Sequence, residues 1–134
     1  MAIRAELEGN LTKNPEGKYV QVGGENRMIV EMRVFSDVNR RTDDGWEQDD
    51  DRSGGVDVTI WNEKLAKEVL AHFKKGARVL VLDQLHLHNY EDEDGVQHAF
   101  LRMAAETVGL QPYRIEGLTF RPSKSREETA GAPT

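Results

Sequence analysis

The chain has no cysteine among its 134 residues. This absence excludes disulfide bonds, zinc sites built from thiolates and catalysis by a cysteine nucleophile. Long apolar runs are also missing, since no segment approaches the roughly 20 apolar residues that a membrane-spanning helix needs. The first ten residues, MAIRAELEGN, lack the apolar stretch that is typical of a secretory signal. We therefore expect a soluble, cytoplasmic protein with no membrane partner.

Recognisable catalytic motifs are absent as well. The sequence contains no phosphate-binding glycine loop, no nucleophile elbow and no paired catalytic histidine motif. We therefore expect no enzyme, no catalytic residues and no cofactor.

Basic residues are fewer than acidic residues in this chain. The chain has 24 acidic residues against 18 lysines and arginines, a net charge of -6, and this balance argues against a nucleic-acid partner. However, six of the acids lie in residues 43–51 and four more in residues 91–94, and neither run contains a base. The remaining sequence holds 14 acids and 18 bases. The acidity is thus confined largely to two predicted loops, which either keep the protein soluble or weaken anion binding nearby.

Alternating apolar and polar residues predict a mainly β fold. The alternation is clear in residues 3–11, 28–34 and 56–60, and it is the period of half-buried strands. A short extra strand is expected at residues 18–22, between two glycine-containing turns. On the second long strand, the side chains expected to face outward are Arg27, Ile29, Glu31, Arg33 and Phe35.

Residues 37–55 break this pattern. They show no usable periodicity, and they carry the first acidic run followed by Ser53, Gly54 and Gly55. We expect a long mobile loop here, with Trp46 isolated inside it.

One helix is predicted between the third and fourth long strands. Asn62 is a favourable N-cap, and an apolar stripe at helical spacing follows it. The stripe consists of Leu65, Ala66, Val69, Leu70 and Phe73. Lys74 and Lys75 would then complement the helix dipole, and Gly76 is expected to be the left-handed residue that follows the helix (C′).

The last two strands, residues 78–90 and 98–108, are predicted to form a hairpin. A two-residue loop would set the apolar face of one strand against the polar face of the other. A three-residue loop that ends with Gly95 in the left-handed conformation instead pairs like with like. The pairs expected on one face are Tyr90 with His98, His88 with Phe100, and His86 with Arg102. That face therefore carries aromatic, imidazole and guanidinium groups together.

Three of the histidines raise the question of a metal site. His86 and His88 lie two residues apart on one strand face, and His98 lies across the hairpin, so three imidazoles could hold zinc. In the expected register, however, His98 is opposite Tyr90 and not beside His86. We therefore expect no metal site.

Five long strands with one α-helix between strands 3 and 4 is the order of a five-stranded OB-fold barrel. Several motifs along residues 1–112 are more specific. They are Gly9-Asn10-Leu11 with Asn14-Pro15-Glu16, Val58-Thr59-Ile60-Trp61 before Lys64-Leu65-Ala66, Lys75-Gly76 before a valine-rich strand, and Gln84-Leu85 before Tyr90 and Asp94-Gly95. In this order and at this spacing, they resemble bacterial single-stranded DNA-binding proteins. We expect an OB-fold domain over residues 1–115 and a flexible tail over residues 116–134.

The resemblance implies sequence-independent binding of single-stranded DNA in replication, recombination or repair, with RNA as a possible alternative ligand. It also implies a nucleoid-associated homo-oligomer, and a tetramer is favoured over a dimer. Bases would stack on exposed aromatic rings while basic side chains follow the DNA backbone. The expected DNA-binding residues are Arg4, Arg33, Trp61, Lys74, Lys75, His86, His88, Tyr90, Phe100 and Arg102.

The chain departs from the family pattern at several positions. Asn39 and Gly55 lie about where the family commonly has two further tryptophans, and His86 and His88 fall where arginines are common. Because each base–aromatic stack is worth about 1–3 kcal/mol, we expect weaker binding than is typical of the family. The sequence ends in Gly-Ala-Pro-Thr and not in a short acidic, apolar tip, so recruitment of repair proteins through the C-terminus is not expected. This pattern suggests an accessory, plasmid or phage-associated member.

Structural roles compete with DNA binding for some of these residues. Trp61 could be a core or interface residue, and Tyr90 could serve only in cross-strand packing. The outward arginines Arg27, Arg33 and Arg102 are also placed to pair with glutamates on neighbouring strands. Those glutamates are Glu6, Glu8 and Glu31. The alternative function is therefore an OB-fold protein-interaction module with little or no DNA binding.

Overall fold

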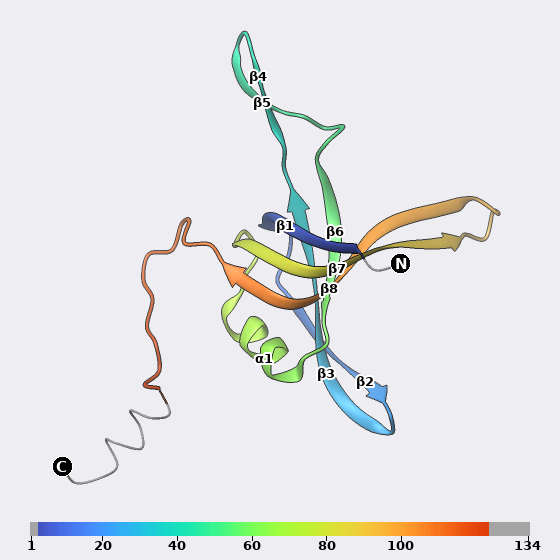
Figure 1. The fold of residues 1–134 in the computed structure, drawn as a ribbon, viewed down its shortest axis with the longest axis vertical. Helices are drawn as coiled ribbons and strands as arrows, with labels where there is room; N and C mark the ends of the chain where they lie inside the picture. The colour runs from blue at the N-terminus through green and yellow to red at the C-terminus, as the bar shows by residue number, and fades with distance from the viewer. Residues whose placement is uncertain (1–2, 124–134) are drawn as a thin grey trace.

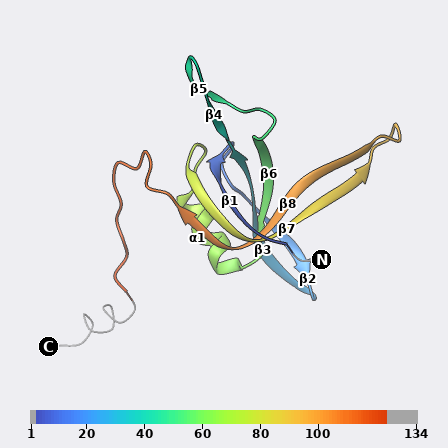
Figure 2. The ribbon, with the colours of Figure 1, turned by 45° about the horizontal axis from the view of Figure 1, so that its top comes forward.

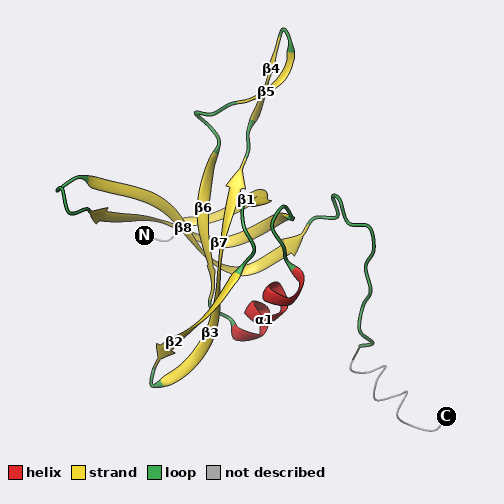
Figure 3. Ribbon diagram, turned by 180° about the vertical axis from the view of Figure 1, so that it is seen from behind, coloured by secondary structure: helices red, strands yellow, loops and turns green. Residues whose placement is uncertain are grey.

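The computed structural model describes residues 3–123, most of which lie in strands. Figures 1 and 3 show how the strands and the helix are arranged. The elements are β1 (Ile3–Leu11), β2 (Glu16–Val22), β3 (Glu25–Ser36), β4 (Asn39–Thr42), β5 (Gly45–Gln48), β6 (Gly54–Ile60), α1 (Glu63–His72), β7 (Arg78–Glu91) and β8 (Gln97–Leu110).

Five strands close into a barrel. Around the ring, β1 pairs with β7, β7 with β8, β8 with β6 and β6 with β3. Strand β3 then returns to β1 through the pairs Asn10–Phe35 and Leu11–Val34. The β6–β8 pairing is parallel, and the helix lies between the third and fourth barrel strands along the chain. The predicted OB-fold is therefore confirmed, and the predicted short strand is β2, which pairs with β3.

The barrel interior is filled by the apolar positions that alternate along the strands. Val30, Val34, Ile60, Val79 and Val81 have essentially no exposed surface. Helix α1 packs mainly against β3, and its buried residues, Ala66 and Val69, join this core. Burying a valine- or isoleucine-sized side chain contributes roughly 1.5–3 kcal/mol, so this cluster is the main source of stability.

The predicted start of the helix is confirmed, but its predicted end is wrong. The Leu65 N–H donates to Asn62 Oδ1 at 3.0 Å, which is the expected N-cap. The helix ends at His72, and Phe73 is already extended, with its ring packed against the core. Gly76 does have a positive φ of 89°, but it lies in the next turn, where the Ala77 N–H donates to the Lys74 carbonyl at 3.0 Å.

The predicted mobile loop over residues 37–55 contains a β-hairpin. Strands β4 and β5 pair in register, and an ion pair of 2.7 Å joins Arg40 to Glu47 across them. Gly45, with a φ of 117°, closes the turn after Asp44. The hairpin projects away from the barrel in Figures 1 and 2, and nearly all its residues are exposed. Because neither face is buried, its strands carry no apolar alternation that the sequence could reveal.

Two positions depart from the expected alternation. Ile29 was expected to face solvent, but it is only 2% exposed. It pairs in register with Lys18 of β2, and its neighbour Val30 pairs with Ile60 of β6, so Ile29 lies where β3 is an inner strand of the sheet. In the β7–β8 ladder the register shifts between Leu82–Thr107 and Asp83–Ala105, which leaves Glu106 as one extra residue on β8. This bulge moves the core-facing positions of β8 from odd to even residue numbers.

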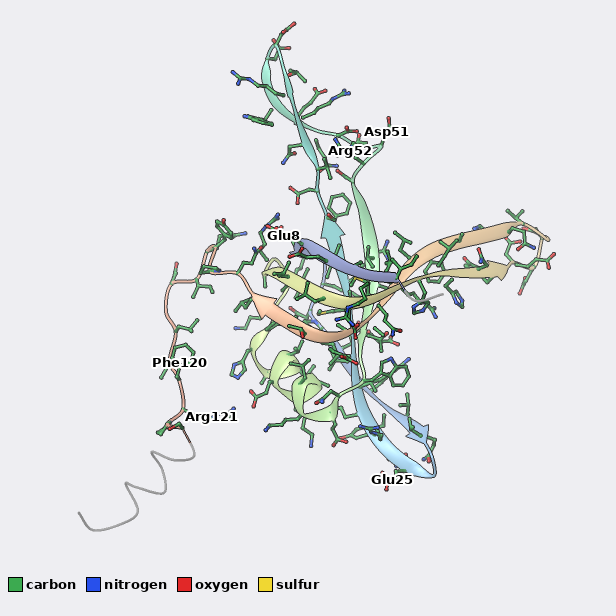
Figure 4. The ribbon with its side chains drawn as sticks, viewed as in Figure 1. Glu8, Glu25, Asp51, Arg52, Phe120 and Arg121 are labelled. Carbon is green, nitrogen blue, oxygen red and sulfur yellow. The ribbon has the colours of Figure 1, made fainter. Side chains whose placement is uncertain are left out.

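Residues 111–123 follow β8 without forming a helix or strand. Figure 4 shows Phe120 and Arg121 on this segment, and the Arg121 guanidinium contacts the Glu68 carboxylate of α1 at 2.5 Å. The domain boundary at residue 115 and the flexible tail over residues 116–134 stay predictions. The Gly-Ala-Pro-Thr end lies outside the described residues.

Arg78, at the start of β7, links three separate segments. Its guanidinium contacts Asn10 Oδ1 at 2.7 Å and the carboxylates of Glu8 and Asp37 at 3.2 Å each. The hydrogen bond from Arg78 lowers the pKa of the Asp37 carboxyl below its ordinary value of 3.8. Arg78 therefore ties β1 and the segment after β3 to β7 where the barrel closes.

Replacing Arg78 with methionine should lower the free energy of unfolding by about 2 kcal/mol, because three polar partners lose their donor. The matched variant Arg40→Met breaks only an exposed ion pair on the β4–β5 hairpin and should leave the denaturation midpoint nearly unchanged. Chemical denaturation followed by circular dichroism measures both. Equal losses of stability in both variants would contradict this role of Arg78.

The Asp37–Arg78 pair also makes stability depend on pH. Because the folded state lowers the Asp37 pKa, the contribution of Asp37 to stability is present above pH 3.8 and is lost as the pH falls through the lowered value.

Candidate nucleic-acid interface

The outward side chains of β3, β6, β8 and β7 form one continuous surface, which we call the outer face. Across it, Arg33 pairs in register with Asp57, Asp57 with Arg102, and Arg102 with His86. Two further pairs continue along the β7–β8 hairpin, His88 with Phe100 and Tyr90 with His98. The three hairpin pairs expected from the sequence are therefore confirmed.

The tip of this hairpin has the predicted three-residue loop. The Asp92 N–H donates to the Val96 carbonyl at 3.0 Å, and Gly95 has a φ of 80°. The Asp92 carboxylate accepts from the N–H groups of Asp94 and Val96 at 2.9 Å each, and it contacts His98 Nε2 at 2.6 Å. The His98 hydrogen bond, together with these two N–H groups, lowers the pKa of Asp92. The acidic tip thus holds His98 in place.

Aromatic rings cluster on the outer face of the hairpin. The rings of Tyr90 and His98 stack with centroids 4.9 Å apart and an interplanar angle of 17°. His88 and Phe100 lie 5.0 Å apart, and the Arg102 guanidinium carbon lies 4.8 Å from the Phe100 centroid. Tyr90 therefore does pack across the strands, yet 45% of its surface stays exposed. The cluster combines ring faces with a cation, which suits a flat, anionic ligand.

Trp61, which follows β6, is the second aromatic group of this face. It is 49% exposed, so it is not a core residue. It borders a groove of about 440 Å³, which we call the Trp61 groove. The groove is lined by Arg27, Trp61, Asn62, Asp83, Gln84, Ala104, Ala105 and Glu106.

Carboxylates hold several cations of the outer face, but they are not the predicted ones. Arg33 pairs with Asp57 at 2.8 Å, and Arg4 pairs with the buried Asp83 at 3.3 Å. The expected partners are used elsewhere: Glu31 pairs with Lys18 and Glu8 with Arg78, and Glu6 makes no ion pair within residues 3–123. Arg27 and Arg102 have no carboxylate partner in the same part of the chain. The exposed Arg33–Asp57 pair contributes about 0–1 kcal/mol, so a phosphate can replace Asp57 at small cost, whereas moving Arg4 to a phosphate would leave the buried Asp83 carboxylate without its counter-charge.

The predicted site residues do not all lie together. Arg33, Trp61, His86, His88, Tyr90, Phe100 and Arg102 share the outer face, and Arg4 borders it through Asp83. Lys74 and Lys75 do not lie with them. They precede the start of β7 at Arg78, whereas Tyr90 of the aromatic cluster lies near the far end of this strand. The two lysines line a separate groove with Tyr113 and Arg114.

The sequence prediction missed a second exposed aromatic–cation pair. Trp46 lies on the projecting β4–β5 hairpin, paired in register with Arg41, and it is 72% exposed. The Asp44-Gly45 dipeptide between them is a hairpin signal that could have located this pair. Arg27, Asp83 and Glu106 of the Trp61 groove were also missed as site residues. The bulge that positions Glu106 leaves no clear mark in the sequence.

The described residues provide neither a metal-binding cluster nor a membrane-spanning helix. Within residues 3–123, no three histidine, aspartate or glutamate side chains cluster so that they could hold a metal ion. In the same range, no helix has the length and apolar character needed to cross a membrane.

A closed five-stranded barrel whose outer face presents aromatic rings beside cations defines an OB-fold with a nucleic-acid-type binding surface. The sequence profile of the "Single-strand binding protein family" matches residues 3–111, so the chain belongs to this family. Single-stranded DNA-binding protein 1 of Clostridium acetobutylicum is 31% identical over 102 residues, which cover 76% of this chain and 86% of that protein. Single-stranded DNA-binding protein 2 of Listeria monocytogenes is 32% identical over 124 residues, 89% of this chain and 71% of that one.

Solved structures show the same fold. The small single-stranded DNA-binding protein of Streptomyces coelicolor superimposes with a TM-score of 0.69 at 18% identity, covering 84% of this chain and 97% of that chain. The Plasmodium falciparum SSB, solved in complex with single-stranded DNA, gives a TM-score of 0.60 at 12% identity, with coverages of 80% and 90%.

Proposed function

We propose that this protein binds single-stranded DNA with little dependence on sequence, and that it acts in replication, recombination or repair. The observation that carries the proposal is the outer face, where Trp61 and the Tyr90–Phe100 cluster flank Arg33 and Arg102. Stacking of bases on such rings is sequence-tolerant because every base has a π-face, and cations between the rings suit the phosphates. Membership of the single-strand binding protein family supports the same conclusion.

The strand would run across the sheet from the Trp61 groove to the hairpin. One base stacks on Trp61, and others stack on Phe100 and Tyr90. On Tyr90 the base stacks on the exposed part of the ring, which His98 does not cover. Phosphates contact Arg33 and Arg102 on the way, with His86 and His88 alongside. Arg4 contacts the DNA at the edge of this path. Lys74 and Lys75 join only if the strand continues around the end of the barrel.

We also propose that binding is weaker than is usual for the family. Arg33 and Arg4 are already engaged by Asp57 and Asp83, so a phosphate must compete with a carboxylate for each of them. In such an exchange the freed carboxylate takes up a cation, which offsets the counterion that leaves the phosphate, so the net release is small. The dependence of affinity on salt should accordingly be shallower than the number of cations suggests.

The first test is Trp61→Ala. Loss of one base stack, worth about 1–3 kcal/mol, should weaken binding of labelled oligo-dT by about 5- to 150-fold in fluorescence anisotropy. Phe120→Ala is the matched control, because Phe120 is an exposed aromatic residue on the segment after β8 (Figure 4). If oligo-dT binds neither the wild type nor the control, the alternative function, an OB-fold protein-interaction module, is favoured.

The second test is Asp57→Asn. Removing this charge frees Arg33 for phosphate, so the affinity for oligo-dT should rise by about two- to fivefold and its salt dependence should steepen. Glu63→Gln on α1 changes the net charge equally but frees only Lys67 on the helix, so it should have little effect. The role of Asp57 is refuted if both variants change the affinity alike.

We further propose a homo-oligomer, with a tetramer favoured over a dimer. On the other face of the β7–β8 hairpin, the rows of core-facing apolar side chains extend past the core and become exposed. These exposed residues are Leu87, its partner Leu101, and Ile3 of the neighbouring β1, and Leu87 is 57% exposed. Apolar surface of this kind suits a second copy of the chain. Multi-angle light scattering should give four protomers for the wild type and fewer for Leu87→Glu. A monomeric wild type would refute the proposal.

A further inference from the structure

The Trp61 groove combines an aromatic ring with more hydrogen-bond acceptors than a phosphate site would have. Its lining includes two acidic residues, Asp83 and Glu106, and two amide residues, Gln84 and Asn62, of which Asn62 already uses its side-chain oxygen to cap α1. Arg27 is its one cation. Carboxylates repel phosphate, and they can only accept hydrogen bonds when ionised. The groove therefore suits the edge of a base, with the phosphate kept toward Arg27.

Glu106 lines the same groove as Trp61. The parallel register pairs Thr59 of β6 with Ala104 of β8, and Trp61 and Glu106 each lie two residues beyond this pair along their own segments. Glu106 is the extra residue of β8, and a bulge re-aims the side chain that it adds. Within residues 3–123, no hydrogen bond or ion pair engages the Glu106 carboxylate. It is thus a free acceptor next to the proposed stacking platform.

Asp83 lies on β7, across from the bulge, and unlike Glu106 it is buried and paired with a cation. Its side chain is 7% exposed, and its charge is balanced by Arg4 at 3.3 Å. Its φ of 142° is unusual for a residue with a side chain, so the bulge holds it in a strained conformation. Asp83 therefore forms a fixed wall of the groove, and Glu106 is left as its available acceptor.

Bases differ in what they offer to such an acceptor. Cytosine carries an amino group on its edge, and Asp or Glu side chains accept from it. Thymine and uracil carry a carbonyl oxygen at the same ring position, and that oxygen repels a carboxylate. We infer that the Trp61 groove is a base-reading position that prefers an amino-bearing base, cytosine among the pyrimidines, with Glu106 as the acceptor. This inference rests on the proposed binding of single-stranded DNA.

The test compares labelled oligo-dC and oligo-dU of equal length in fluorescence anisotropy. These two bases differ at the edge and share the absence of a methyl group. The wild type should bind oligo-dC about three- to tenfold more tightly, which is the discrimination expected of one such contact. In Glu106→Gln the ratio should fall to within about twofold, because a glutamine amide can also donate to the uracil carbonyl. Trp61→Ala should lose the ratio as well.

Glu25→Gln is the matched control, since it removes the same charge at the β2–β3 turn (Figure 4) from a residue that does not line the groove. It should retain the preference. Equal affinities for oligo-dC and oligo-dU in the wild type would overturn the inference but leave the proposed function standing. A Glu106→Gln variant that binds both more tightly and keeps the ratio would also overturn it, because Glu106 would then act only through its charge. Failure to bind either oligonucleotide would overturn both proposals.

Discussion

The β7–β8 ladder is the interaction on which the rest of the structure depends. Strand β7 pairs with β1, and β8 pairs with β6, so this ladder joins the N-terminal strand to the parallel β6–β8 pairing on one side of the ring, while β3 closes the ring on the other side. Its register also decides which side chains meet on each face, since a shift of one residue would exchange the two faces. The core, the aromatic cluster and the position of Glu106 therefore follow from one set of backbone hydrogen bonds.

The same ladder gives the hairpin two different surfaces. Beyond the barrel, one face carries Tyr90, His98 and Phe100, and the other carries Leu87 and Leu101. A strand alternates its side chains, so both surfaces arise from one pair of strands without additional structure. The hairpin can in this way serve a flat, charged ligand on one side and an apolar partner on the other. Its acidic tip supports the first surface, since Asp92 holds His98 of the aromatic cluster.

Charge on the outer face is balanced locally. Asp57 faces Arg33, Asp83 faces Arg4, and Glu31 faces Lys18, which explains how an acidic protein can keep cations on a proposed DNA-binding surface. The balance also limits the surface, because each paired cation is partly neutralised before a phosphate arrives. Arg102 is different, since it lies over the Phe100 ring and no carboxylate of the described residues pairs with it.

Local patterns in the sequence determined the strand order, the Asn62 cap, the outward position of Trp61 and the pairing of Tyr90 with His98. Each depends on residues close in the chain: alternation, one side-chain cap, or the loop length before Gly95. The tertiary structure alone decided the partners of Arg33 and Arg4, the early end of α1 before the partly buried Phe73, the burial of Ile29 and the bulge at Glu106. These depend on strands brought together from distant parts of the chain, and the β4–β5 hairpin buries no face that would leave a pattern. The sequence therefore determined the scaffold and its aromatic groups, whereas long-range packing decided the charges and acceptors beside them.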